Sequence, residues 1–425
     1  MPEYKRKRRG RFSSAPKVTK KRTKKTAEDL NIPMTSAEKQ YKPRKNMRVV
    51  KGKKLEAKRR FKLWASIIGV VMAVLLICEL FMPAGVFETA SNTLKLIGGG
   101  SYPIDLESNN TSTVVSKGSY YYVLSSNSIT AFSNSGKKIF THSHGFENPV
   151  IKTSKTRALV FDQGKKDILI FTLDGLESSK TFKHDIKTAA IGDNGTYAVV
   201  TSSENYTAQV SVFKKNNQPV YEWFSSVDLV NNVGVSPSGK KIAVATISSK
   251  VGGYNSKVSV LNFKSATPEN EKIFENTIVY ALDTTFGSGF SVITANSYNF
   301  FKWSNFKSKE YKNEYNSAMF RTGNNGLAVV FNRENDKTDN RIAVFSSGGK
   351  LKKEFEFKGI ITDFAVRNGN IYCVSDTKAY VLGRDGKVIR SGECGFGVVK
   401  IVPFGQNIMA VVTDNEINKL KLEQE

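Results

Sequence analysis

The chain has 425 residues, of which 64 are Lys or Arg and 38 are Asp or Glu, and its formal net charge is +26. It contains three histidines and three cysteines, and the sequence has no Ser-His-Asp motif, Walker loop or HExxH motif. The known signatures of hydrolase, nucleotide-binding and zinc-protease sites are therefore missing.

Residues 1–60 are strongly basic and are expected to form a largely disordered cytoplasmic tail. Residues 1–62 hold 24 Lys or Arg and five Asp or Glu, a net charge of +19, which leaves +7 for the rest. A segment of this composition cannot bury a core. The tail either serves topology alone, contacts anionic lipid head groups, or binds an acidic partner or nucleic acid. Binding to nucleic acid through the run Lys5–Arg9 would be independent of base sequence.

Residues 61–83 are expected to form one transmembrane helix. The stretch Leu63–Met82 contains a single charged residue, Glu79. At about 1.5 Å per residue, a helix of this length spans roughly the 30 Å hydrocarbon core of a bilayer. Leu63 and Trp64 at one end and Met82 at the other mark the expected membrane anchor.

Basic residues next to a span stay on the cytoplasmic side. We therefore expect a single-pass protein of the cell membrane, with its N-terminus in the cytoplasm and its C-terminal domain outside. The residues expected to contact anionic lipid are Lys53, Lys54, Lys58, Arg59, Arg60 and Lys62.

Two other interpretations of the apolar segment fit the sequence less well. A cleaved signal peptide has a short basic region and an apolar core of about 7–15 residues, and both regions are longer here. A lipoprotein anchor at Cys78 would lie far too deep in the chain, and Ile77 replaces the small residue expected before the cysteine. An uncleaved anchor fits better than either.

After a linker over 84–100, a repeat begins and continues through 101–425. A small turn followed by an apolar strand recurs at intervals of about 36 to 48 residues, as in propeller blades. The eight occurrences begin at Gly118, Arg157, Gly195, Lys241, Gly289, Gly326, Asn370 and Asn407.

Each repeat resembles four antiparallel strands, and the second is expected to have them at 149–153, 157–161, 168–173 and 179–183. A single blade cannot bury both of its faces, but blades stacked around an axis can. We predict an all-β, eight-bladed propeller, with seven blades as the alternative. The fourth repeat is the least regular, because a long loop is expected at 248–256.

The last repeat lacks an outer strand, while Ser101–Leu106 before the first repeat is strand-like and has no blade of its own. We predict that this segment completes the last blade. Such a clasp would remove the open edge of the ring.

The cycle of turns and strands from Gly118 to Lys138 resembles the quinoprotein-type and WD40-like propeller superfamily. The whole layout is similar to a family of uncharacterised, membrane-anchored propeller proteins of Gram-positive bacteria, a domain of unknown function. Quinoprotein repeats end in a tryptophan, whereas only Trp223 partly fits here. No quinone or other cofactor is therefore expected.

Candidate catalytic residues are few. His142 and His144 could place two imidazoles on one face of a strand as a metal pair, but a zinc site needs a third or fourth ligand. Surface polar residues at a blade rim are the simpler interpretation. Cys373 and Cys394 lie on strands that are not neighbours, so two reduced thiols are expected.

Two classes of function fit these observations. The first is a non-catalytic scaffold that binds a protein or a cell-envelope polymer on one propeller face. Tyrosines could supply a stacking surface there, although most are expected in the core: Tyr120, Tyr121, Tyr122, Tyr254, Tyr298, Tyr311 and Tyr315. The alternative is an enzyme, or a protein that binds a sugar or quinone in the central funnel. The scarcity of histidine favours the scaffold.

Overall fold

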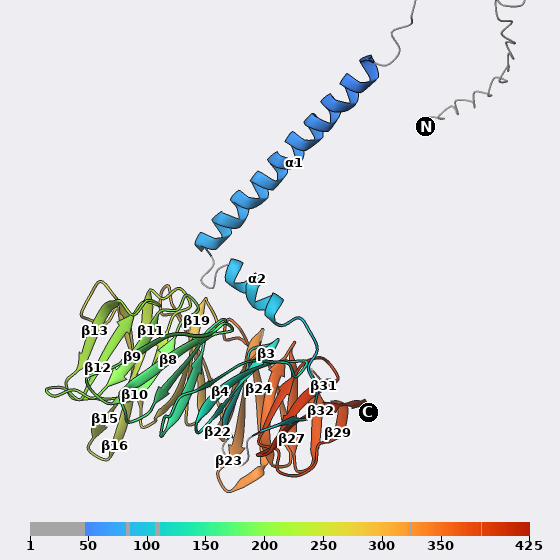
Figure 1. Cartoon of the computed structure of the whole chain (residues 1–425). Helices are drawn as coiled ribbons and strands as arrows, with labels where there is room; N and C mark the ends of the chain where they lie inside the picture. The colour runs from blue at the N-terminus through green and yellow to red at the C-terminus, as the bar shows by residue number, and fades with distance from the viewer. Residues whose placement is uncertain (1–46, 82–85, 107–110, 324, 384) are drawn as a thin grey trace, which may run out of the picture. The chain divides into compact units, whose positions relative to one another are not determined.

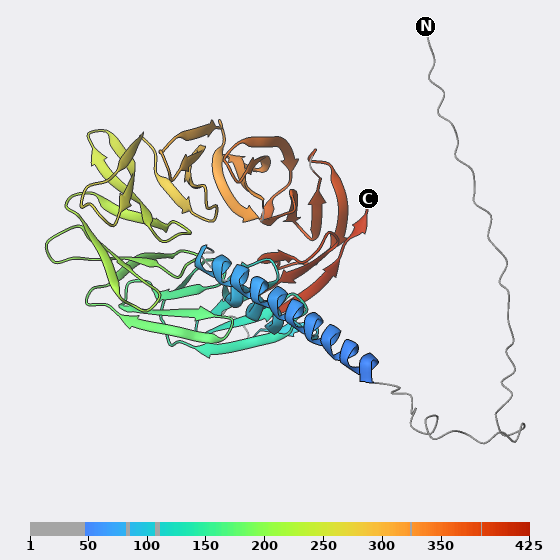
Figure 2. The same cartoon turned by 90° about the horizontal axis from the view of Figure 1, so that it is seen from above.

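The computed structural model describes residues 47–81, 86–106, 111–323, 325–383 and 385–425. The chain divides into two compact units, residues 1–72 and 73–425. The second unit contains a ring of β-sheets (Figures 1 and 2).

Helix α1 (Met47–Phe81) contains the apolar segment. Within it, residues 60–77 are long and apolar enough to cross a bilayer. The side chains of Leu63 and Trp64 are exposed. Met82 lies outside the described residues, as does the basic tail up to residue 46.

A second helix, α2 (Val86–Lys95), occupies part of the stretch that sequence analysis treats as a linker. It carries Glu88 in its first turn and Lys95 in its last, which complements the helix dipole at both ends. The expected linker is therefore partly a structured element.

The ring has eight sheets, which confirms the prediction of eight blades. Seven blades consist of four consecutive antiparallel strands each. The first four are β2 (Thr111–Ser116), β3 (Tyr120–Ser125), β4 (Ser128–Ser133), β5 (Lys138–Ser143); β6 (Pro149–Thr153), β7 (Ala158–Asp162), β8 (Asp167–Thr172), β9 (Gly175–Thr181); β10 (Ile186–Ile191), β11 (Tyr197–Thr201), β12 (Ala208–Phe213), β13 (Pro219–Ser225); and β14 (Leu229–Val235), β15 (Lys241–Lys250), β16 (Gly253–Asn262), β17 (Asn270–Glu275).

The next three blades follow the same order. They are β18 (Val279–Asp283), β19 (Gly289–Thr294), β20 (Ser297–Lys302), β21 (Ser308–Lys312); β22 (Asn316–Gly323), β23 (Gly326–Arg333), β24 (Asp336–Ser346), β25 (Leu351–Lys358); and β26 (Ile361–Arg367), β27 (Asn370–Ser375), β28 (Lys378–Leu382), β29 (Val388–Glu393).

The eighth blade closes the ring as predicted. It has the order β1-β32-β31-β30, with β30 (Lys400–Pro403), β31 (Ile408–Val412) and β32 (Glu416–Lys421) from the end of the chain and β1 (Ile104–Asp105) from before the first blade. Ile104 pairs with Ile417 and Asp105 with Glu416. A short strand, β33 (Glu423–Gln424), then adds to the outer edge of the seventh blade through β29.

The fourth blade differs from expectation. Residues 248–256 do not form a long loop, because β15 and β16 continue as a ladder up to the pair Lys250 and Gly253. The ladder with β17 ends at Asn255, and beyond it β15 and β16 continue as a two-stranded extension.

The core lies between the blades rather than within them. Alternate side chains of β3 point to opposite neighbours: Tyr122 packs against the second blade and Tyr121 against the eighth. Both are buried, as are Tyr120, Tyr298 and Tyr315. Most of the tyrosines proposed as a stacking surface therefore stabilise the ring, and among them Tyr254 remains exposed.

Candidate functional site

The strand order gives the ring two distinct faces. We define the helix face as the loops that join the first to the second and the third to the fourth strand of each blade. The hairpin face comprises the loops between the second and third strands and those between blades. Loops of one face contact each other: the Asn134 amide donates to the Ser119 carbonyl (3.1 Å) on the helix face, and the His144 amide donates to the Asn127 carbonyl (2.9 Å) on the hairpin face.

Helix α2 is attached to the helix face over the first two blades. Arg157, which is 4% exposed, binds Glu177 through Nε (2.7 Å) and Glu88 of α2 through Nη1 (3.0 Å). Lys95 forms an ion pair with Asp174. Burial alone would lower the pKa of Arg157, but the two carboxylates outweigh this effect and raise it.

The chain continues from α2 along the first blade. The Lys137 ammonium donates to the carbonyls of Lys95 (3.1 Å) and Ile97 (2.8 Å), and Leu96 packs into the core between the first two blades. The β15–β16 and β23–β24 hairpins extend from the opposite face (Figure 1).

Near the axis of the ring, three inner strands share one buried carboxylate. Asp363 of β26 is 2% exposed and binds Arg321 of β22 and Lys400 of β30, whose ammonium lies 3.0 Å away. It also accepts the Ile401 amide (3.0 Å). Burial lowers the pKa of Lys400, and Asp363 opposes this shift. Because these charges satisfy each other, the cluster joins three blades and leaves no carboxylate free for catalysis.

A second axial group surrounds Lys117, which follows β2. Asp193, Asp283 and Lys155 come from three other blades and all act electrostatically on its ammonium. Asp193 pairs with Lys155 at 3.2 Å, whereas Lys117 forms no ion pair with any residue that the structure describes. Burial lowers the pKa of Lys117.

The unfavourable desolvation of the Lys117 ammonium predicts that Lys117→Met stabilises the folded protein. A lysine with a lowered pKa binds fewer protons when folded than when unfolded, so it penalises the folded state below its folded pKa, and this penalty disappears as the pH rises to about 10.5. Because the Lys117 side chain is half-buried rather than fully buried, the variant should be more stable at pH 7 by only about 1 kcal/mol, the lower end for a desolvated polar group without a partner. Urea unfolding between pH 7 and 10.5 should show this gain shrinking as the pH rises. Lys240→Met, on an exposed turn, is the control, and an equal gain in both variants would contradict the assignment.

The hairpin face carries exposed apolar side chains and an excess of acidic ones. Its described loops contain eight Asp or Glu and three Lys. Val227 is 84% exposed and Phe396 is 88% exposed, although both are large apolar residues. The exposed large apolar residues in these loops are Tyr206, Val227, Val251, Ile360, Phe396 and Val399.

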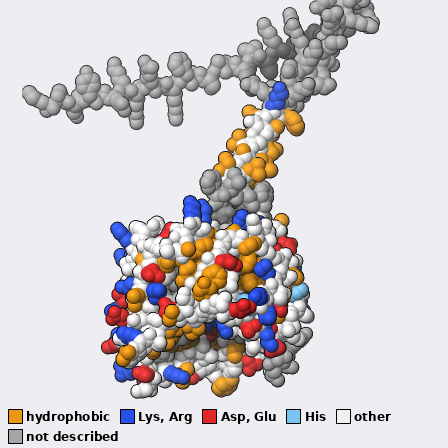
Figure 3. Space-filling model, turned by 90° about the vertical axis from the view of Figure 1, so that its left-hand side faces the viewer, with side chains coloured by type: hydrophobic (Ala, Val, Ile, Leu, Met, Phe, Trp, Pro, Cys, Tyr) orange, Lys and Arg blue, Asp and Glu red, His pale blue; other side chains and the backbone are white. Residues whose placement is uncertain are grey.

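No loop of the helix face, within the described ranges, contains an exposed large apolar side chain. On the hairpin face, Leu229 and Tyr280 extend the apolar surface at the start of adjacent inner strands, where the Asn232 amide contacts the Tyr280 carbonyl (3.3 Å). Figure 3 shows the side of the ring that carries β12, β13, β15 and β16, where hydrophobic side chains gather between charged margins. Where exposed apolar groups form a contiguous patch on a soluble surface, they typically mark an interaction site.

The two histidines proposed as a metal pair lie at the end of β5. His142 packs against the Phe171 ring at 5.2 Å. His144 has its Nε2 3.2 Å from the Ser125 carbonyl, and its Nδ1 accepts the Phe146 amide at 3.0 Å. Burial lowers the pKa of His144. In the part of the chain that the structure describes, no group of three or more His, Cys, Asp or Glu could hold a metal ion.

Both cysteines of the propeller are free thiols. Burial raises the pKa of Cys373 to about 12. The Cys394 thiol is partly exposed and lies 3.0 Å from the Thr377 carbonyl. Neither has the lowered pKa of a nucleophile.

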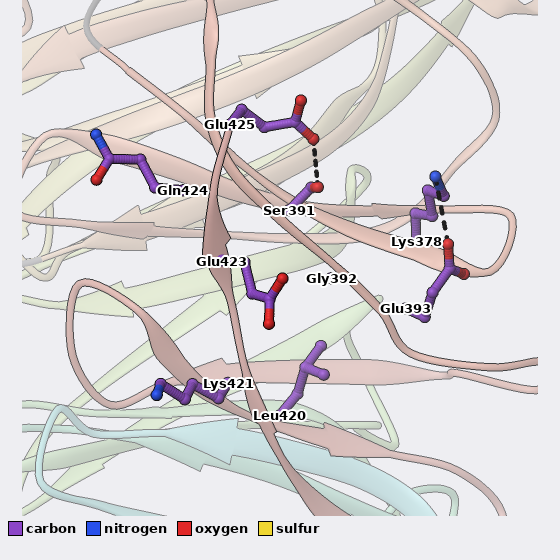
Figure 4. A pocket seen from close by; sticks show the side chains of 9 residues that line it. All are labelled: Lys378, Ser391, Gly392, Glu393, Leu420, Lys421, Glu423, Gln424 and Glu425. Atoms are coloured by element: carbon purple, nitrogen blue, oxygen red, sulfur yellow. Dashed lines mark hydrogen bonds and ion pairs between the residues drawn. The ribbon is translucent and has the colours of Figure 1, made fainter.

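A hollow of about 590 Å³ lies beside β29, β32 and β33 (Figure 4). Its wall includes the ion pair of Lys378 and Glu393 (3.3 Å) and the contact of Ser391 with Glu425. The ion pair lies within the seventh blade, between β28 and β29, and the contact of Ser391 with Glu425 lies where β33 joins that blade. The hollow is therefore part of ring closure rather than a site with converging free groups.

Sequence reasoning did not reveal the division into two faces. The sequence feature that indicates this division is a lysine in the turn before the outer strand. It recurs from blade to blade, as at Lys350 and Lys387. Because single lysines on turns are common, only the topology shows that they gather on one side.

The similarity to one solved structure, BamB, supports the fold. BamB from Moraxella catarrhalis is similar over 76% of this chain and 98% of its own, with 9% identity and a TM-score of 0.50. The Cps50 (Swd1) β-propeller domain of Myceliophteria thermophila covers 64% of this chain and 95% of its own, with 10% identity and a TM-score of 0.46. At these identities the likeness concerns the fold alone.

No curated protein sequence matches the chain. A family of unknown function, DUF5711, matches residues 101–422, which covers the propeller from its first strand to the end of the eighth blade. The chain therefore belongs to the DUF5711 family.

Proposed function

We propose that the protein is a single-pass, membrane-anchored scaffold whose extracytoplasmic propeller binds another protein through the hairpin face. The exposed apolar side chains in the loops of that face carry this proposal. The described loops of that face also hold eight acidic and three basic residues, so the partner we propose is an envelope protein with an apolar patch and a basic rim. Burying such a patch would supply affinity, and the charges would supply orientation.

The anchor is the apolar segment of α1. It has the length and composition of a membrane span, and the basic tail before it predicts a cytoplasmic N-terminus. Arg60 and Lys62 are exposed at the start of the segment, where they would contact anionic lipid. We propose the same role for Lys53, Lys54, Lys58 and Arg59, whose side chains lie outside the described part.

The axial groups argue for a scaffold rather than an enzyme. Arg321, Asp363 and Lys400 bind each other, and Asp193 binds Lys155. A catalytic acid or base needs a free position beside its substrate. An interaction module needs only a rigid frame, which the cores between the blades provide.

Photo-crosslinking in intact cells tests this function. A photoreactive residue at position 251 should yield a discrete adduct with an extracytoplasmic protein, and V227D/F396D should abolish it because two charges would be buried in the contact. L176D/I389D, which changes exposed apolar residues at the outer edge, should leave the adduct intact. A cytoplasmic partner would refute the orientation, and an adduct that is insensitive to V227D/F396D would refute the hairpin face.

A further inference from the structure

The two faces of the ring carry opposite charge. The described loops of the helix face contain eleven Lys or Arg and four Asp or Glu, whereas those of the hairpin face contain three and eight. Every blade contributes loops to both faces. The charge difference therefore belongs to the whole faces rather than to one blade. A difference of this kind gives the disc a strong electrostatic polarity.

Most cations in the described loops of the helix face form no ion pair with another described residue. Arg157 and Lys137 hold α2, and Lys155 pairs with Asp193. Seven others are exposed, and none forms an ion pair with another residue of the described ranges. They come from five successive blades, the third to the seventh: Lys214, Lys215, Lys240, Lys264, Lys307, Lys350 and Lys387.

The same face receives the chain from the expected membrane span. Five peptide links join Phe81 to Val86, and an extended chain covers at most about 3.6 Å per residue, or about 18 Å in total. Since α2 is fixed to the helix face by Arg157 and Lys95, a span ending near Phe81 keeps this face close to the bilayer.

The side of helix α2 that faces away from the ring also supports a position of the helix face close to the bilayer. Asn92 is buried on the side that contacts the ring, whereas Leu94 is 68% exposed and Ile97, just beyond the helix, is 64% exposed. Exposed aliphatic side chains next to a basic surface are typical of segments that lie in the interface of an anionic bilayer.

We propose that the helix face rests on the outer surface of the membrane, where its seven unpaired lysines bind anionic phospholipid head groups. Basic residues close to an anionic surface are attracted within about a Debye length, roughly 8–10 Å at ordinary salt. This inference rests on the proposed membrane anchor, and it directs the hairpin face away from the membrane toward a partner.

Lysine footprinting of the full chain in nanodiscs tests the proposal. The protein is placed in discs of phosphatidylcholine or of phosphatidylcholine with an equal share of phosphatidylglycerol, treated with an amine-acetylating reagent, and analysed by mass spectrometry. The seven lysines should be modified at least about threefold more slowly in the anionic discs, and high salt should remove the difference. Lys165, Lys166 and Lys183 of the hairpin face are internal controls and should react equally in both.

Charge-reversal variants test whether the lysines of the helix face themselves cause the protection. K214E/K215E/K264E/K307E should remove the protection of the remaining helix-face lysines, whereas K165E/K166E/K183E should preserve it. Equal modification in both discs by a chain that copurifies with them overturns this inference while leaving the anchor in place. A chain that copurifies with neither disc refutes the anchor and this inference with it. Protection by soluble poly(glycerol phosphate), with none added by the anionic discs, would assign the face to a polymer and overturn the lipid assignment.

Discussion

Asp363→Asn is expected to lower the free energy of unfolding by about 3 kcal/mol, because breaking a buried charge network by removing one partner leaves the other charges uncompensated. The asparagine side chain would keep an acceptor for the Ile401 amide but would lose the charge that binds Arg321 and Lys400. Asp363→Ala should cost more, because the amide then also loses its partner.

The pH dependence of the stability of Asp363→Asn shows whether uncompensated charge causes this loss. The pKa of Lys400 is already lowered by burial, and without Asp363 it should fall further. Such a lysine penalises the folded state below its folded pKa, and the penalty is relieved as the pH rises toward 10.5. Urea unfolding should therefore show a deficit for Asp363→Asn that narrows at alkaline pH. Asp414→Asn, on an exposed loop, is the control, and a deficit that is constant with pH would point to altered packing instead.

Arg157→Met is expected to have a comparable effect and to release α2 from the ring. The Arg157 guanidinium is buried and binds Glu177 at 2.7 and 2.9 Å and Glu88 at 3.0 Å. Methionine would retain the apolar stem but leave two carboxylates without their partner. Both carboxylates are about a quarter exposed and can regain some hydration, so we expect a loss near the lower end of the 3–5 kcal/mol range, about 3 kcal/mol.

Hydrogen exchange separates this release from a general loss of stability. In Arg157→Met, the amides of α2 should exchange faster by at least tenfold while those of β11 and β12 keep their protection relative to global unfolding. Lys165→Met, which removes an exposed ion pair with Glu147 on the hairpin face, should leave both regions unchanged. Unaltered exchange in α2 would show that its attachment does not depend on Arg157.

Much of the ring could be predicted from sequence because each blade repeats its own signals. Gly118 and Gly195 both have positive φ, which turns at these points require, and the apolar strand after each turn fills the space between blades. The clasp was predictable for a related reason: the last repeat has one strand too few and Ile104 belongs to a strand without a sheet.

Other features depend on contacts that no local pattern encodes. The attachment of α2 relies on Glu88 meeting Arg157 and Lys95 meeting Asp174, pairs that are 69 and 79 residues apart. The extension of β15 and β16 beyond the sheet has a polar, serine-rich sequence that is equally typical of a loop. The candidate surfaces were hidden for the same reason, because only the topology places the loops of Val227 and Phe396 on the same face of the ring.

The attachment of α2 also determines how the protein would carry mechanical load. A pull on the chain from the side of α1 reaches α2 first and is opposed by two ion pairs to the second blade, followed by the Lys137 contacts to the first. Only beyond these points does the chain reach β1, whose pairing with β32 is just two residues long. Contacts with the first two blades therefore bear tension along the chain before it reaches the two-residue pairing of β1 with β32.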